Sequence, residues 1–113
     1  MLTIEMLKEY GADTDTALGR CFGNEAFYFR LVGMASASAE FDKLSEAVEK
    51  GDLQDAFNQA HALKGILGNL SLTPAYDKVC EITELLRAGT QMDYSERVAQ
   101  ILEERDKIAE MCR

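Results

Sequence analysis

The sequence is poor in several residue types, and each shortage removes a class of fold or function. Its 113 residues contain one proline, one histidine, no tryptophan and three cysteines. The cysteines, Cys21, Cys80 and Cys112, are far apart and odd in number, which is the pattern of neither a disulfide framework nor a zinc site. We therefore expect no metal site, and free thiols without an export signal at the N-terminus predict a cytoplasmic protein.

Positive charge is also scarce. Twelve basic residues stand against twenty acidic ones, which gives a net charge of −8 at pH 7. An acidic surface repels nucleic-acid phosphates and anionic lipids, so neither a nucleic acid nor a membrane is an expected partner. No apolar stretch approaches the ~20 residues of a membrane span, and the alternating β-branched runs typical of strands are absent.

What the chain does contain favours an all-helical fold. Apolar residues make up 47% of it, enough for a core, and Ala, Leu, Glu, Lys, Met and Gln are abundant. One long helix is expected to bend between Gly33 and Ala39. Apolar spacings of three and four, together with cap and stop residues, predict helices over residues 3–10, 14–20, 24–50, 52–70, 73–89 and 93–111.

Short loops between long helices place successive helices antiparallel to one another. We therefore predict one domain over residues 1–113. A short N-terminal helical cap over about 1–23 precedes an antiparallel up-down-up-down four-helix bundle over 24–113. Within the bundle, Thr73 is the expected N-cap of its helix with Pro74 in the first turn, and Asp93 is expected to open the last helix.

The only histidine lies in the segment QAHALKGILGNL, residues 59–70, where a helix contains two glycines at a cost of about 1 kcal/mol each relative to alanine. On a helical wheel the apolar side chains of residues 52–70 fill one broad sector, which must face the core. His61 lies roughly 130° from the centre of that sector, so we expect it to be exposed. The same stripe of the helix holds Gln54, Asn58, Gly65 and Gly68.

Lys64 stands one turn from His61, and together the two side chains suggest phosphoryl chemistry. Neutral imidazole is a good nucleophile near neutral pH, and a lysine can offset the charge of a phosphoryl group held on it. Glycines at 65 and 68 would let a bulky partner approach the imidazole. The same residues also fit a passive surface histidine, with the glycines marking close helix packing, and the pattern alone leaves both interpretations open.

The segment HALKGILGNL resembles the signature of histidine-containing phosphotransfer (HPt) domains, in which His is followed by two residues, then Lys-Gly and small residues. The stretches LKEYGADTDTALGRCFGNEAFYFRLV, EAVEKGDLQDAFNQAHALKG and CEITELLRAG are similar to other parts of bacterial HPt proteins. The resemblance thus covers nearly the whole chain. The matching signature positions are His61, Leu63, Lys64, Gly65, Gly68 and Leu70.

The resemblance implies that His61 accepts a phosphoryl group from a receiver-domain aspartate, or from a kinase, and passes it to another receiver. Lys64 would steady the phosphoryl group. The implied partners are a response-regulator receiver domain and a hybrid sensor histidine kinase. The protein would be a phosphocarrier rather than an enzyme, with no ATP site and no cofactor of its own, because the receiver supplies magnesium.

The docking surface follows partly from the resemblance and partly from the helical wheel. Gly65 and Gly68 would leave clearance for the receiver, and Gln54 and Asn58 are candidate docking contacts. We expect a monomer, since nothing in the sequence requires a dimer.

Three positions depart from the family pattern, and one of them, Leu67, is bulkier than usual but falls on the core side of the helical wheel. Ser71 stands where glycine is common, so the turn after the helix can differ, and Ile66 is bulkier than usual and can widen an apolar docking patch. These two changes bear on the choice of partner, while His61 and Lys64 are intact. The alternative function is a helical interaction module that binds a receiver or a kinase without carrying phosphate.

Overall fold

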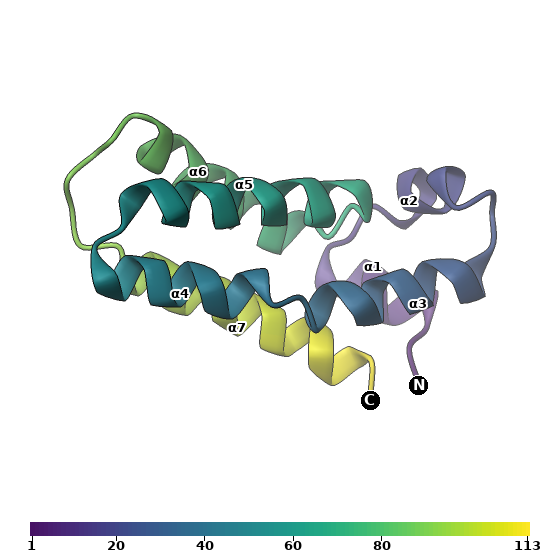
Figure 1. The fold of residues 1–113 in the computed structure, drawn as a ribbon. Helices are drawn as coiled ribbons and strands as arrows, with labels where there is room; N and C mark the ends of the chain where they lie inside the picture. The colour runs from purple at the N-terminus through teal and green to yellow at the C-terminus, as the bar shows by residue number, and fades with distance from the viewer.

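The computed structural model describes all 113 residues and contains helices and loops but no strands, which confirms the all-helical prediction (Figure 1). None of the helices combines the length and the apolar character needed to cross a bilayer. The helices are α1 (Ile4–Tyr10), α2 (Thr14–Arg20), α3 (Glu25–Ser36), α4 (Glu40–Lys50), α5 (Leu53–Asn69), α6 (Thr73–Arg87) and α7 (Ser95–Met111).

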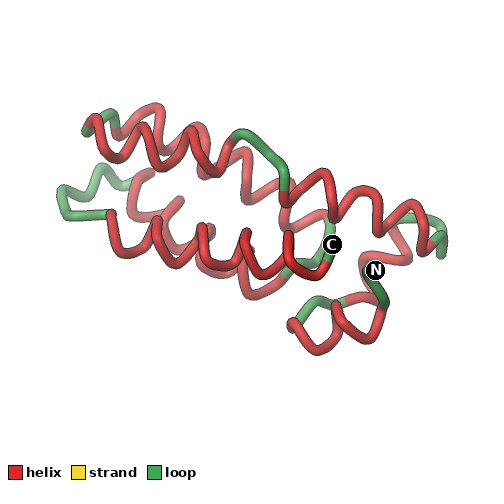
Figure 2. Tube along the Cα trace, turned by 90° about the horizontal axis from the view of Figure 1, so that it is seen from below, coloured by secondary structure: helices red, strands yellow, loops and turns green.

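Four of these helices surround the main part of the core. Helix α5 packs between α4 and α6, and α7 packs against both α6 and α4. Only Gly51 and Asp52 separate α4 from α5, and three residues separate α5 from α6, so the chain reverses direction at each connection. Figure 2 shows these connections as short loops at the ends of the helices, while α1, α2 and α3 extend beyond one end of the group.

The single bent helix predicted over residues 24–50 is two helices. Helix α3 ends at Ser36 and α4 begins at Glu40. Serine hydroxyls compete for the last carbonyls of α3: Ser36 Oγ donates to the carbonyl of Gly33 at 2.9 Å, and Ser38 Oγ donates to the carbonyl of Met34 at 3.4 Å. Such local bonds offer the backbone an alternative to the helical ladder, and here they accompany its interruption.

Two helix starts also differ from the prediction. Leu72, not Thr73, is the N-cap of α6, and the Thr73 hydroxyl donates to the carbonyl of Ser71 at 3.3 Å instead. Proline in the first turn of α6 is as predicted. Helix α7 begins at Ser95, whose backbone N–H donates to Asp93 Oδ1 at 2.9 Å, so the aspartate organises the turn just before the helix.

One core of 25 buried residues extends from Leu2 to Ile108 and includes residues of the N-terminal helices. Leu7 of α1 and Ala17 of α2 are both fully buried. Gly11, with φ of +111°, ends α1 against the start of α6, where an added Cβ would lie 2.9 Å from Pro74 Cγ. The N-terminal helices are therefore packed onto the rest of the protein rather than tethered to it.

A buried carboxylate ties three helices together. Glu104 of α7 is only 2% exposed, yet it accepts hydrogen bonds from Tyr10 Oη of α1 at 2.9 Å and from Lys78 Nζ of α6 at 2.6 Å. Lys107 Nζ adds a third bond at 3.3 Å. Burial disfavours the charged form, but the hydrogen bonds from these partners outweigh it and hold the pKa of Glu104 below its ordinary value.

Glu104→Gln should destabilise the protein by about 1–3 kcal/mol, because it removes a charge that accepts three hydrogen bonds. A carboxylate whose pKa is lowered by folding stabilises the protein above its unfolded pKa, and this contribution is lost as the pH falls through the folded pKa. Urea unfolding of wild type should therefore show a loss of stability below about pH 4.5 that is smaller in the variant. Equal stabilities at neutral pH would contradict this role for Glu104.

Candidate functional site

Helix α5 carries the sequence motif, and its orientation agrees with the helical wheel. Asp52 caps the helix by accepting the N–H of Asp55 at 3.1 Å. The buried residues of α5 are Ala56, Ala60, Leu63 and Leu67. His61 lies on the opposite side and is exposed, as predicted.

The imidazole of His61 lies beside the aromatic ring of Phe57, one of the apolar side chains of residues 52–70 that the helical wheel directs toward the core. Phe57, one turn earlier in α5, is half-buried, and its ring centroid is 5.7 Å from that of His61, with 34° between the planes. The guanidinium carbon of Arg87, from α6, lies 5.1 Å from the Phe57 centroid. The spacing of four residues between Phe57 and His61 was the available sequence signal, whereas the contact from Arg87 depends on how α6 packs on α5.

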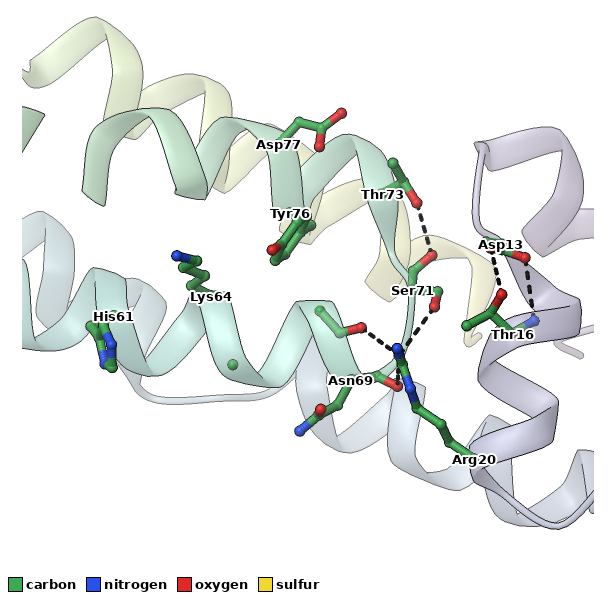
Figure 3. Close-up of a pocket in the computed structure, with 12 residues that line it drawn as sticks. Asp13, Thr16, Arg20, His61, Lys64, Asn69, Ser71, Thr73, Tyr76 and Asp77 are labelled. Atoms are coloured by element: carbon green, nitrogen blue, oxygen red, sulfur yellow. Dashed lines mark hydrogen bonds between the residues drawn. The ribbon is translucent and has the colours of Figure 1, made fainter. Parts of the chain in front are cut away.

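Lys64 is half-buried, and its ammonium group forms no salt bridge and no hydrogen bond. Figure 3 shows its side chain directed toward α6, along the same groove that His61 lines. A lysine side chain is long and flexible, so its charge can move toward a group attached to His61, one turn away. The cation is therefore free to meet an anion at this site.

The two glycines of the motif have different surroundings. A Cβ added at Gly65 would meet no atom within 4 Å, so this position is open. At Gly68 the added Cβ would lie 2.9 Å from Tyr76 Cε1 of α6. The prediction that both glycines leave clearance for a partner therefore fits Gly65, whereas Gly68 permits close packing of α5 on α6.

The remaining candidate residues lie toward the start of α5. Gln54 and Asn58 are both exposed, and Gln54 Nε2 donates to Asn58 Oδ1 at 3.3 Å. They precede His61 by two turns and one turn of the helix, on its exposed side. A partner that covers His61 from this end would meet their amide groups.

An open groove extends from His61 along α5, between this helix and the start of α6, to the end of α2 (Figure 3). Its basic side chains are Lys64 and Arg20, and its acidic ones are Asp13 and Asp77. Sequence reasoning missed most of the lining because it comes from three different helices and the loops between them. The lining residues outside the motif are Asp13, Thr16, Arg20, Ser71, Thr73, Tyr76 and Asp77.

The far end of the groove is fixed by contacts to the last carbonyls of α5. Arg20 Nη1 donates to the carbonyls of Gly68 at 2.9 Å and Asn69 at 3.1 Å, and Tyr28 Oη donates to the carbonyl of Leu70 at 2.9 Å. These side chains supply donors to carbonyls at the end of the helix, and the carbonyl of Gly68 also accepts the N–H of Ser71 at 3.1 Å. They connect the N-terminal helices to the end of α5.

Ser71 adopts the left-handed conformation, with φ of +53°. This conformation favours glycine, the residue common at this position in the family that the sequence resembles. The carbonyl of Ser71 accepts the N–H of Asp13 at 3.0 Å. Ser71 therefore adopts a backbone geometry suited to glycine, the residue that it replaces in the family pattern.

Alanine substitutions separate the roles of the two glycines. Gly65→Ala should raise the free energy of unfolding by about 1 kcal/mol, because helix propensity improves and the added methyl meets nothing. Gly68→Ala should raise the free energy of unfolding clearly less than Gly65→Ala, or lower it, because the Tyr76 ring must move. Urea unfolding of both variants tests this difference, and equal gains would show that the contact with Tyr76 has no energetic consequence.

Comparison with known proteins identifies one family. The family model for the Hpt domain matches residues 33–111, from the end of α3 through α7. The match includes the whole of α5 and hence every candidate residue of the motif, but it leaves out α1, α2 and most of α3. No curated protein and no solved structure matches the chain.

Proposed function

Because the chain belongs to the Hpt domain family, we propose that it is a phosphocarrier of a two-component phosphorelay with His61 as its phosphoacceptor. His61 would accept the phosphoryl group from a receiver-domain aspartate, or from a kinase, and pass it to a second receiver. The partners are thus a response-regulator receiver and a hybrid sensor histidine kinase. Family membership supports phosphotransfer in two-component signalling, and the assignment to His61 is our extension of it.

The observation that carries the proposal is the combination of three features on one helix. His61 is exposed, Lys64 has a cation without a partner, and the surface at Gly65 is open. A nucleophile, a compensating charge and room for a second active site are what phosphoryl transfer between proteins requires. No other histidine competes for the role, since the chain has only one.

In the transfer step, an imidazole nitrogen of His61 attacks the phosphorus of the aspartyl phosphate. A P–N bond forms as the P–O bond breaks, the aspartate leaves as a carboxylate, and the proton on the other ring nitrogen is released to solvent. Lys64 then lies within one helical turn of the new dianionic group and offsets its charge. The reverse sequence returns the phosphoryl group to a receiver.

The remaining parts of the proposal follow from this assignment. The protein acts as a carrier without an ATP site, and the receiver supplies the magnesium ion and the catalytic groups. In this proposal residues 24–113 form the antiparallel up-down-up-down four-helix bundle, with α3 and α4 in series as its first member, and residues 1–23 are its cap within a single domain over 1–113. The protein is proposed to act in the cytoplasm as a monomer, with Gln54 and Asn58 as docking contacts for the receiver.

A second candidate is an interaction module that binds a receiver or a kinase without carrying phosphate. It uses the same exposed surface around Gly65 but needs neither the nucleophile nor the cation. The presence of His61 beside an unpaired Lys64 favours the phosphocarrier.

His61→Gln should abolish phosphoryl acceptance and leave the fold intact, because His61 lies outside the core. After treatment with phosphoramidate, wild type should gain one acid-labile phosphoryl group by mass spectrometry, and the variant should gain none. Circular dichroism should show the same helicity for both. A wild-type protein that stays unmodified would favour the interaction module, and a large loss of helicity in the variant would contradict the exposed position of His61.

Gly65→Leu should lower the rate of transfer from a phosphorylated receiver by at least about tenfold, because the new side chain fills the open surface that the receiver approaches. Phosphorylation by phosphoramidate should be almost unchanged, since a small donor needs no such clearance. The rates with both donors are compared by Phos-tag electrophoresis. Gly19→Leu is the matched control, because Gly19 is also in a helix with nothing near its Cβ but lies on α2. Equal slowing by both substitutions would refute the role of Gly65.

A further inference from the structure

We propose that Phe57 is a positioning residue for His61, and that Arg87 holds the Phe57 ring in place. This inference rests on the proposed function of His61 but adds two residues outside the family signature. The imidazole of His61 lines the groove toward α2, but its aromatic contact is with Phe57, which is not among the residues of that groove.

The imidazole of His61 has no polar restraint. It forms no hydrogen bond and no salt bridge with another side chain or with the backbone beyond its own helix. On the C-terminal side its neighbour along the stripe is Gly65, which offers no side chain to pack against. The aromatic contact with Phe57 is thus the interaction that restrains the exposed ring.

Helix geometry explains why Phe57 is suited to this task. Side chains on a helix lean toward its N-terminus, so a residue covers the turn before its own Cα. His61 therefore leans over Phe57, one turn earlier, and the two ring centroids are 5.7 Å apart. That distance lies within the ~4.5–7 Å range of favourable aromatic pairs.

Phe57 is itself held from the neighbouring helix. The Arg87 guanidinium lies 5.1 Å from the Phe57 centroid, a cation–π distance, and Arg87 Nε contacts Glu84 Oε2 at 3.3 Å. Phe57 is half-buried and lines one pocket together with Leu53 of α5 and Leu86 near the end of α6. The order of contacts is therefore Glu84, Arg87, Phe57 and His61, from α6 to the nucleophile.

Positioning matters because transfer from a receiver is an in-line displacement. The attacking nitrogen must face a phosphorus atom that the receiver holds in a fixed orientation, and a misplacement of ~1 Å can cost about 100-fold in rate. A small donor such as phosphoramidate diffuses to the imidazole in any of its rotamers. Loss of the Phe57 ring should therefore slow transfer from a receiver far more than phosphorylation by the small donor.

The test compares Phe57→Leu and Phe57→Tyr with wild type. A receiver that phosphorylates wild type should react about tenfold more slowly with Phe57→Leu, and within about twofold of wild type with Phe57→Tyr, which restores the ring. Phosphoramidate should modify all three at similar rates. Phe29→Leu is the matched control, since Phe29 is also half-buried and paired with an aromatic ring, that of Tyr28 on α3.

A spectroscopic readout separates positioning from a structural role. His61 is the only histidine, so its ring protons give unambiguous NMR signals. The ring current of Phe57 should displace these signals in wild type and Phe57→Tyr, and the displacement should disappear in Phe57→Leu. Arg87→Met, at a residue whose side chain is 51% exposed, should reduce both the displacement and the receiver rate without a change in melting temperature.

Each result decides one point. If Phe57→Leu accepts phosphoryl groups from the receiver at the wild-type rate, or if phosphoramidate labelling slows to the same extent, Phe57 does not position the nucleophile. If Phe29→Leu slows transfer as much as Phe57→Leu, the effect is a general loss of packing and the inference is wrong. If wild type accepts phosphate from neither donor, the proposed function fails, irrespective of Phe57.

Discussion

The burial of one face of α5 between α4 and α6 is the constraint on which the site depends. Leu63 and Leu67 of that face are completely buried, and each such side chain contributes about 1.5–3 kcal/mol when it leaves water. A rotation of α5 that moved His61 inward would expose these leucines, so the core fixes the direction of the imidazole. His61, the proposed nucleophile, therefore lies on a helix that is packed on both sides, by α4 and by α6, which gives it a rigid support.

Around this helix the protein combines rigid support with an uncovered surface. Arg20 and Tyr28 bind the carbonyls at the end of α5, and Glu104 links α1 to α6 and α7. The side of α5 that faces away from the core has a glycine at 65, an unpaired lysine at 64 and a histidine without hydrogen bonds. The stabilising hydrogen bonds thus lie away from the exposed side of α5. His61 and Lys64, which are proposed to meet the partner's phosphoryl group, form no side-chain hydrogen bond or salt bridge that would compete with it.

The sequence was a good guide wherever local periodicity decides the structure. The exposed position of His61 followed from the apolar sector of one helix, and the helical class followed from composition and spacing. It misled where neighbouring hydroxyls compete with the helical ladder, as at Ser36 and Ser38, which accompany the break between α3 and α4. It also treated Gly65 and Gly68 alike, because a wheel shows which residues share a stripe but not what stands opposite them.

The sequence by itself determined that the protein is helical, that its one histidine lies off the core, and that the motif around it resembles that of a phosphotransfer family. Those properties depend on residue type and on the ~3.6-residue period of an α-helix, and both can be read from the order of residues along the chain. Only the tertiary structure decided that Tyr76 occupies the space at Gly68 and that Arg87 lies over Phe57 beside the imidazole. These contacts join residues from different helices, and the packing of α6 on α5 sets them.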